Sequence, residues 1–331
     1  MAVALMYNFR TKYHLKPKTS PMKAVILNEY GSADVLKNTE VEKPTYGASQ
    51  ILMRVKASGI NLIDAKMRAG DVADMMPKSF PLILGWEASG IVDAIGSNVK
   101  NFKAGDEVYS HINMMAGGSY AEYVAVHENE AALKPKILSH VQAATVPMNA
   151  STAYTSLIKI ANIQKGQKVL IHGAAGSVGS FAVQIARMKG AYVIATTSGK
   201  GLTLVKELGA DEVIDYKTTD FTAVVKDADM VLDVLGGETQ IKSLSVLKQG
   251  GLLLTTVPLA LAPEKLAEYD VTAEFFFTSP DASILAQLAQ WIDEGKLKTP
   301  EPIILNLSKA SKAHRMMEER TAHGKLVFEI S

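Results

Sequence analysis

The sequence predicts an α/β protein in which a doubly wound parallel sheet is inserted into a β-rich domain. Residues 22–147 contain short strands separated by Gly, Asn and Asp, whereas apolar strands alternate with helices after Pro147. The last apolar segment, residues 324–330, has no obvious place in such a parallel sheet. Because 331 residues are enough for two domains, we expect the chain to begin and end in the β-rich domain.

The composition excludes several classes of protein and partner. The chain has no cysteine, which excludes disulfide scaffolds, thiolate zinc sites, iron–sulfur clusters and a cysteine nucleophile. Its 35 basic and 34 acidic side chains nearly cancel, so neither a nucleic acid nor an anionic membrane is indicated as a partner. No apolar run reaches the roughly 18 residues that a membrane span requires. We therefore expect a cytoplasmic chain.

Residues 1–21 differ in charge from the sequence that follows. Their apolar start is short and has no basic segment before it, so it does not resemble a secretory signal. Their charged side chains are all basic: Arg10, Lys12, Lys16 and Lys18. We expect a flexible N-terminal extension, with Met22 as the alternative natural start.

The β-rich domain is expected over residues 22–147. Apolar and polar residues alternate here between turn residues, as in strands with one buried face. The segments are residues 22–30, 51–60, 85–96 and 105–112. Short strands with few helical stretches favour a folded sheet or a partial barrel.

The α/β unit is expected over residues 148–279. Its strands are almost wholly apolar, as expected when helices cover both faces of a parallel sheet. The strands are residues 168–173, 191–197, 212–216, 229–237 and 252–257. The helices are residues 178–189, 202–208 and 238–249, each followed by a glycine suited to ending a helix.

The tail of the chain mixes both kinds of element. It contains a strand at 274–277, an amphipathic helix at 283–296, a short strand at 303–307, a charged helix through Met316 and Glu319, and the final strand. Because the final strand has no partner in the α/β unit, residues 280–331 are expected to return to the β-rich domain.

A phosphate-binding turn follows the first strand of the α/β unit. It has the pattern G-x-G-x-x-G with alanine in the first place: a small residue opens the turn, the second glycine lets the backbone approach a pyrophosphate, and the third lets the helix pack on the strand. The turn lies between a strand and a helix, so it predicts a Rossmann-type dinucleotide site. The residues concerned are Ala174, Gly176, Ser177, Val178 and Gly179.

The end of the next strand favours NADPH over NADH. An NAD site usually has an acidic residue there to hold the ribose 2′-hydroxyl. This chain has Thr196, Ser198 and Lys200 instead, and the first acidic residue after them is Glu207. Ser198 can hydrogen-bond to a 2′-phosphate and Lys200 can neutralise it, although Lys200 is also compatible with a solvated loop.

With these features the chain resembles the medium-chain dehydrogenase/reductase superfamily. The β-rich start, the HGAAGSVGS turn, the TVPMNASTAYTSL segment before it and the closing GKLVFEI carry the resemblance, which runs from Met22 to the end. It implies that the β-rich domain is a GroES-like catalytic domain. It also implies a homo-oligomer, expected as a dimer.

The resemblance is to the zinc-independent branch of that superfamily. Zinc-dependent members have a cysteine and a histidine at the positions of Asn61 and Trp86, and a catalytic zinc needs three N, S or O ligands, so no metal is expected. The branch includes quinone oxidoreductases and NADPH-dependent enone or alkenal reductases. Lys66, after the Asn-x-x-Asp motif, favours the second group, because many quinone reductases have a tyrosine there.

The resemblance implies hydride transfer from NADPH to an electron-poor carbon of an α,β-unsaturated ketone or aldehyde. Asn61 and Lys66 are the expected catalytic residues, since the oxygen that gains charge needs donors or a cation. As alternatives, Lys66 is a surface lysine and Asn61 forms a turn. The remaining residues are expected at the cofactor: Thr152 beside the nicotinamide (or capping a helix), Tyr216 near the adenosine, and Leu235, Val257 and Phe276 at strand ends.

Three functions remain open. The first is reduction of an activated double bond in a small carbonyl compound, the second is reduction of a quinone, and the third is NADPH binding with little turnover by a sensor or structural protein. The loops with Met75-Met76 and Met114-Met115 are expected at the interdomain cleft, where methionines suit an apolar substrate, although core packing explains them equally well.

Overall fold

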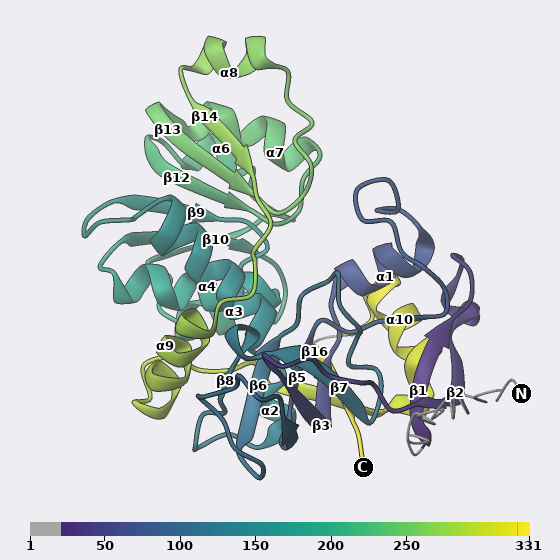
Figure 1. Ribbon diagram of the computed structural model, residues 1–331. Helices are drawn as coiled ribbons and strands as arrows, with labels where there is room; N and C mark the ends of the chain where they lie inside the picture. Colours follow the sequence, from purple (N-terminus) through teal and green to yellow (C-terminus); the bar gives the residue numbers. More distant parts are fainter. Residues whose placement is uncertain (1–20, 323) are drawn as a thin grey trace, which may run out of the picture.

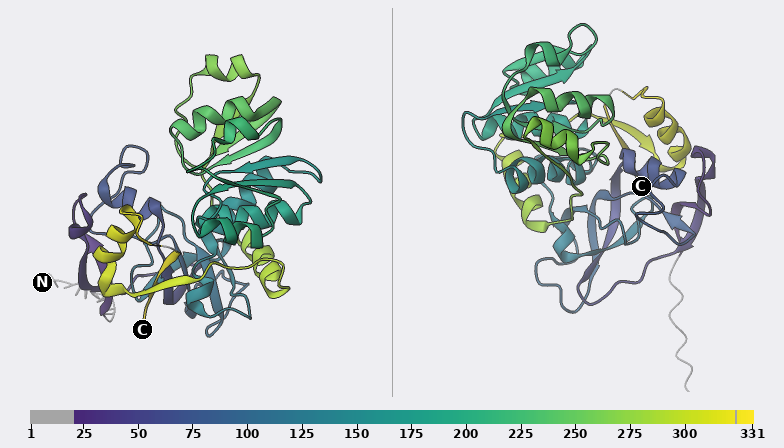
Figure 2. Two further views of the ribbon diagram at one scale, coloured as in Figure 1. Left: turned by 180° about the vertical axis from the view of Figure 1, so that it is seen from behind. Right: turned by 90° about the horizontal axis from the view of Figure 1, so that it is seen from above.

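The computed structural model describes residues 21–322 and 324–331 and consists of two lobes (Figure 1). The expected N-terminal extension lies outside the described residues, except for Pro21, which begins the first strand. Both ends of the described chain lie in one lobe, and the α/β lobe rises beside it (Figures 1 and 2).

The first lobe contains two sheets. One sheet has the order β2-β1-β4, and the other has the order β15-β16-β3-β5-β6-β8, with β7 paired to β3. The strands are β1 (Pro21–Leu27), β2 (Lys37–Glu42), β3 (Gln50–Gly59), β4 (Leu82–Ile83), β5 (Glu87–Ile95), β6 (Glu107–His111), β7 (Tyr123–His127), β8 (Ala131–Leu133), β15 (Pro302–Asn306) and β16 (Lys325–Glu329). The helices of this lobe are α1 (Leu62–Ala69), α2 (His140–Ala143) and α10 (Ala310–Glu318).

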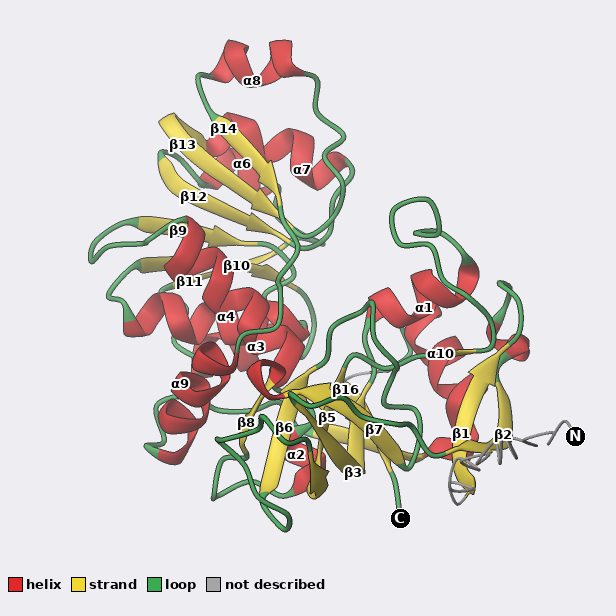
Figure 3. Cartoon of the chain, in the orientation of Figure 1, coloured by secondary structure: helices red, strands yellow, loops and turns green. Residues whose placement is uncertain are grey.

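The second lobe contains one parallel sheet of six strands in the order β11-β10-β9-β12-β13-β14 (Figure 3). The strands are β9 (Lys168–Ile171), β10 (Tyr192–Thr197), β11 (Glu212–Asp215), β12 (Ala228–Asp233), β13 (Leu247–Thr255) and β14 (Thr272–Phe275). The helices are α3 (Pro147–Tyr154), which continues as a π-helical segment (Thr155–Ile160), α4 (Ser177–Met188), α5 (Gly201–Glu207), α6 (Phe221–Val224), α7 (Glu238–Ser243), α8 (Pro263–Tyr269) and α9 (Ala282–Asp293). The predicted fold class is confirmed.

Strand β9 shows why this sheet forms. Val169 and Ile171 lie in one apolar core with Phe181 of α4, while Leu170 lies in a second core with Phe221 of α6. Successive side chains of a strand point to opposite faces, so both faces of β9 are covered by helices. A strand covered on both sides needs apolar residues at every position, which accounts for its sequence.

The last strand lies far from its neighbours in sequence. β16 is parallel to β15 and antiparallel to β3, with Val327 opposite Gly59. Before it, Leu285 and Ile292 of α9 pack in the same core as Phe181 of the α/β lobe. The segment from residue 280 onward therefore contacts the α/β lobe first and joins the β-rich sheet only at β15 and β16.

The helix predicted over residues 238–249 is wrong in its second half. Helix α7 ends at Ser243, a 3₁₀ turn follows, and β13 begins at Leu247. Gly250 lies within the strand at φ +70°, where the register between β12 and β13 shifts. The glycine pair that was expected to end a helix instead forms an irregularity that lets the strand continue.

Candidate active site

The phosphate-binding turn joins β9 to the 12-residue helix α4. A Cβ atom on Gly179 would lie 2.3 Å from the Gly173 carbonyl oxygen and 2.6 Å from Ala174 Cα, so only glycine allows this approach of helix and turn. A Cβ on Gly176 would meet only that oxygen, at 3.1 Å. The helix N-terminus, with its free backbone N–H groups, is therefore held at the end of the strand.

A cavity of about 830 Å³ lies at this turn. Its lining includes residues at the carboxyl ends of β9, β10, β11 and β12, where ligands bind in open α/β sheets. Five of the predicted cofactor residues border it: Gly176, Thr196, Ser198, Tyr216 and Leu235. Ser198 Oγ donates to Tyr216 Oη over 3.1 Å, which joins the ends of β10 and β11.

The other predicted cofactor residues do not line this cavity. Ala174 and Gly179 are used in packing the turn, and Lys200 is the exposed residue that precedes α5. The predicted residues away from the lining are Thr152, Ala174, Ser177, Val178, Gly179, Lys200, Val257 and Phe276.

Three basic residues that the sequence reasoning missed border the cavity: Lys217, Lys242 and Arg320. Lys242 pairs with Glu238 over 2.9 Å, and both side chains are largely exposed. Lys217 directly follows Tyr216, so inspection of the end of β11 could have found it. Arg320 follows α10 of the other lobe, and no local pattern connects it with the cofactor turn.

His172 lines the cavity and connects three elements: the end of β9, β10 and α7. Its ring is buried; Nδ1 lies 2.9 Å from Thr196 Oγ1 and Nε2 lies 3.0 Å from Ser243 Oγ. Burial lowers the pKa of His172 to about 3, so the ring is neutral. The sequence interpretation of His172 as a strand-end residue fits this position.

A second group of polar residues lies in the β-rich lobe around Asn61. The Asn61 carbonyl Oδ1 accepts from Lys325 Nζ at 2.6 Å and from Asn149 Nδ2 at 3.1 Å. Asn61 Nδ2 donates to Glu87 Oε1 at 2.8 Å. We call Asn61, Glu87, Asn149 and Lys325 the polar cluster. All four are at least nine-tenths buried.

Glu87 is the centre of the polar cluster. Its Oε1 forms an ion pair with Lys325 at 2.6 Å, and its Oε2 accepts from the Met148 backbone at 2.9 Å. A Cβ on Gly59 would lie 2.4 Å from Oε1, so the glycine before Asn61 makes room for the carboxylate. The sequence segments that contain Glu87, Asn149 and Lys325 carried the family resemblance, but nothing local indicates that they meet.

The remaining predicted site residues lie on the adjoining helices. Thr152 follows Asn149 by one turn of α3, and its hydroxyl donates to the Met148 carbonyl over 2.7 Å. Lys66 lies in the last turn of α1 and is half-buried; its backbone carbonyl accepts from Gly70 and Asp71, whereas its ammonium group makes no hydrogen bond or ion pair with another described residue.

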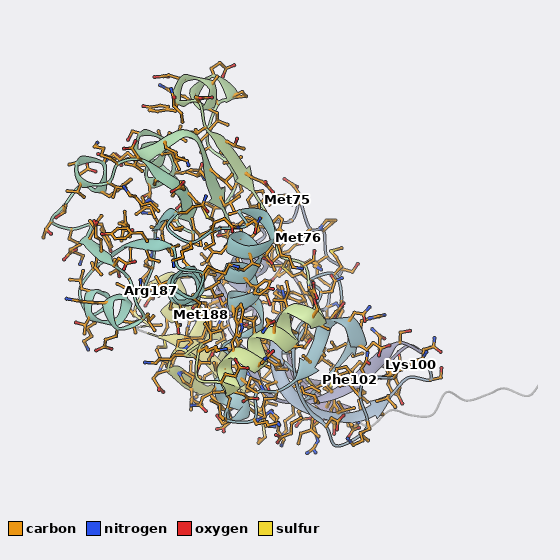
Figure 4. The ribbon with its side chains drawn as sticks, turned by 90° about the vertical axis from the view of Figure 1, so that its left-hand side faces the viewer. Met75, Met76, Lys100, Phe102, Arg187 and Met188 are labelled. Carbon is orange, nitrogen blue, oxygen red and sulfur yellow. The ribbon has the colours of Figure 1, made fainter. Side chains whose placement is uncertain are left out.

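The two methionine loops lie next to each other. Met75 and Met76 belong to the loop after α1 (Figure 4), and Lys78 of that loop donates to the Met114 carbonyl. Met75 and Met115 are 51% and 64% exposed, whereas Met76 and Met114 pack against the β-rich core. Each pair thus divides into one core residue and one surface residue.

The residues around Asn61 do not fit a zinc ion. Trp86 is fully buried and its indole offers no lone pair for a metal, and the Glu87 carboxylate already binds an ammonium group. No group of three His, Asp or Glu side chains within residues 21–322 and 324–331 is arranged to hold a metal.

Comparison with known proteins identifies the family. Residues 47–136 match "Alcohol dehydrogenase GroES-like domain" and residues 208–328 match "Zinc-binding dehydrogenase". The chain is 30% identical to the NAD(P)H oxidoreductase RTN4IP1, mitochondrial, of Danio rerio, over 100% of this chain and 97% of that protein. The chain belongs to the medium-chain dehydrogenase/reductase superfamily.

Two further comparisons support this assignment to the superfamily. The 2-methylene-furan-3-one reductase of Solanum lycopersicum is 36% identical over 93% of this chain and 79% of that protein. The structure of the quinone oxidoreductase from Coxiella burnetii superposes with a TM-score of 0.87 at 33% identity, over 94% of this chain and all of that chain. The chain is thus an oxidoreductase of this superfamily. None of the helices in the described part of the chain has the length and apolar character needed to cross a membrane.

Proposed function

We propose that this superfamily member is an NADPH-dependent reductase that transfers hydride, without zinc, to the activated double bond of an α,β-unsaturated ketone or aldehyde. The cavity at the phosphate-binding turn carries the proposal, because it combines a helix N-terminus, apolar surface and basic side chains. The name of the tomato relative, a 2-methylene-furan-3-one reductase, supports the choice of substrate class.

The residues at the turn fit a dinucleotide. The N-terminus of α4 would hold the pyrophosphate, and the exposed apolar surfaces of Tyr216 and Leu235 suit an adenine ring. No carboxylate follows β10, whereas the Ser198 hydroxyl and the cations of Lys217 and Arg320 border the same cavity. This set favours a 2′-phosphate and therefore NADPH.

The reaction requires the chain to stabilise charge on oxygen. NADPH, when bound, would supply the hydride that the β-carbon accepts; the double-bond electrons would shift onto the carbonyl oxygen as the new C–H bond forms, and a proton from solvent would reach the α-carbon as the carbonyl is restored. We assign the second Nδ2 hydrogen of Asn61 as a donor to that oxygen and the Lys66 ammonium as a nearby cation. We also assign Thr152 a position beside the nicotinamide. The quinone alternative uses the same hydride donor and is favoured by the resemblance to the Coxiella burnetii enzyme.

The test measures NADPH oxidation by the chelator-treated protein with enones, alkenals and quinones, and repeats the measurement with NADH. We expect turnover of an enone or alkenal with NADPH that chelation does not change. Faster turnover of quinones than of every enone selects the alternative. Tight NADPH binding with no turnover of any acceptor contradicts both, and loss of activity on chelation contradicts the zinc-free mechanism.

A further inference from the structure

Lys325 is an unusual residue to find inside the β-rich lobe. Its side chain is 3% exposed, and its Nζ contacts three oxygen atoms: Ile60 O at 2.8 Å, Asn61 Oδ1 at 2.6 Å and Glu87 Oε1 at 2.6 Å. An ammonium group has three hydrogens, so all of them are used. The nearest charge is the fully buried Glu87 carboxylate.

Stability alone is a poor explanation of this ion pair. Removing two charges from water costs several kcal/mol per ion, and a well-packed apolar pair is often as stable or more stable. The pair nevertheless lies against Asn61, the most exposed of the four members of the polar cluster at 8%. The two charges therefore act on the side-chain amide of Asn61.

The first effect is on the orientation of the Asn61 amide. An ammonium group only donates hydrogen bonds and a carboxylate only accepts them. With Lys325 on one side and Glu87 on the other, Oδ1 must face the ammonium and Nδ2 must face the carboxylate. The rotated amide would place N–H against N–H and oxygen against oxygen, so the ion pair fixes one orientation.

The second effect is on the donor strength of the Asn61 amide. One Nδ2 hydrogen is bonded to Glu87, and Asn149 uses its own Nδ2 group toward Asn61 Oδ1 and Glu87 Oε1. The second Nδ2 hydrogen of Asn61 remains for a ligand. A cation 2.6 Å from Oδ1 withdraws electron density from the amide and strengthens that hydrogen as a donor, most of all in a buried site.

We propose that Lys325 is a positioning residue of the reduction reaction: through Asn61, its buried ammonium orients and polarises the amide that donates to the substrate oxygen as negative charge develops there. The inference rests on the proposed function and deepens it. The substrate class that this site suits is a conjugated carbonyl compound whose oxygen gains charge during reduction.

The test uses two variants and two controls. Lys325→Met removes the cation, but it leaves the buried Glu87 carboxylate without its counter-ion and can prevent folding. The double variant Lys325→Met/Glu87→Gln removes both charges of the ion pair, so that neither is left buried without its counter-ion. Lys325→Arg keeps the charge, and Lys312→Met removes an exposed lysine of α10.

Two readouts separate positioning from simple structural support. The first is kcat and KM with an enone and NADPH. The second is the ionised fraction of 4-nitrophenol bound to the protein, read from phenolate absorbance, because a phenolate mimics the charged oxygen without any turnover. Circular dichroism and NADPH fluorescence titration check that each variant is folded and still binds the cofactor.

For the folded double variant we expect kcat to fall about 10-fold to 100-fold, as for the loss of a supporting or oxyanion-binding group, with a smaller change in KM. We also expect a lower ionised fraction of bound 4-nitrophenol, recovery with Lys325→Arg, and no change with Lys312→Met. A folded double variant with wild-type kcat and wild-type phenolate preference overturns the proposal.

The outcomes distinguish this inference from the proposed function. A wild-type protein that binds 4-nitrophenolate in a Lys325-dependent way but reduces no acceptor supports the positioning role and contradicts the reductase function. A wild-type protein that reduces enones yet binds phenol and phenolate equally well contradicts the positioning role and leaves the reductase function in place.

Discussion

At the scale of single residues, the side chain of Asn61 departs from what its place at the start of α1 suggests. An asparagine at a helix N-cap normally accepts a hydrogen bond from the backbone two or three residues later. Here Asn61 begins α1 through its backbone, whose N–H donates to Asp64 Oδ2 over 2.7 Å and whose carbonyl accepts from the Asp64 N–H over 3.0 Å, while its side-chain Oδ1 accepts from Lys325 Nζ over 2.6 Å. Asn61 therefore both begins α1, as the turn-forming alternative expects, and turns its amide oxygen toward Lys325 in the polar cluster.

From the lining of the cavity we predict that Arg320, rather than Lys200, recognises the cofactor. Arg320→Ala removes a side chain that lines the cavity, whereas Lys200→Ala removes one that does not. We expect Arg320→Ala to weaken NADPH binding about 10-fold or more, as for loss of a charge-assisted hydrogen bond, with little change for NADH. Lys200→Ala should have the smaller effect. Fluorescence titrations with both cofactors measure this, and a larger loss for Lys200→Ala would restore the sequence-based assignment.

Lys66 offers a second prediction at this scale. Because its ammonium group has no partner among the described side chains, Lys66→Met should not change the free energy of unfolding by more than about 0.5 kcal/mol. If Lys66 supplies a cation to the reacting oxygen, kcat for an enone should fall about 10-fold or more. Lys37→Met, at an exposed position of β2, serves as the control. Unchanged turnover would show that Lys66 is a surface lysine.

These residues show how far the sequence could predict the site. Gly176 and Gly179 were predictable because their function depends on a turn of a few residues with fixed geometry. Asn61 and Lys66 followed from the family resemblance. Glu87, Lys325 and Arg320 were not assigned, because their positions depend on contacts between segments that are far apart in the chain. No local pattern encodes such contacts.

At the scale of elements, the strand-to-helix turn contains two glycines with different structural demands. Gly179→Ala places a methyl group against the Gly173 carbonyl and should destabilise the packing of α4 by about 1–3 kcal/mol, as other overpacked positions do. Gly176 has φ −76°, which alanine adopts readily, and its added Cβ would lie 3.1 Å from the Gly173 oxygen, so Gly176→Ala should cost less stability than Gly179→Ala, about 1 kcal/mol or less. Because Gly176 borders the cavity, that variant should still weaken NADPH binding.

Urea unfolding and NADPH titration of both variants test this contrast. The sequence pattern predicted that the turn needs glycines. Only the distances in the structure show that Gly179 is required for packing, whereas Gly176 borders the cavity. Equal losses of stability in the two variants would contradict the predicted difference between the two glycines. The mistaken helix at residues 244–249 has the same origin, because the glycines there allow either a helix end or a strand irregularity.

At the scale of the whole molecule, the path of the chain assembles the polar cluster. Strand β16 returns to the β-rich lobe after the entire α/β lobe, and it places Lys325 against Asn61 and Glu87. The same path brings Arg320, which precedes β16, to the cavity at the phosphate-binding turn of the other lobe. The insertion therefore lets one short C-terminal segment contribute residues both to the polar cluster and to that cavity.

The molecule also contains buried titratable groups whose effects on the free energy of unfolding have opposite signs as the pH changes. Burial lowers the pKa of His172 to about 3 and those of His111 and His314 to about 4, whereas burial raises the pKa of Asp64 to about 7. The stability that each neutral histidine contributes is present above its ordinary pKa of 6.5 and is lost as the pH falls toward the lowered value. The contribution of protonated Asp64 is present below 3.8 and is lost as the pH rises through about 7.

Between pH 6.5 and about 4, these three histidines and His140, whose pKa burial also lowers, oppose Asp64 together with Glu130 and Asp233, whose pKa values burial raises. Because the large shifts belong to three histidines and only one carboxyl group, we expect the free energy of unfolding to fall as the solution is acidified. His111→Asn should reduce this slope by up to about 1.4 kcal/mol per pH unit, the value for one proton. Asp64→Asn should make the slope steeper, because it removes the group that opposes the histidines. Urea unfolding at several pH values measures both slopes. If both variants shift the slope in the same direction, these groups do not control the acid response.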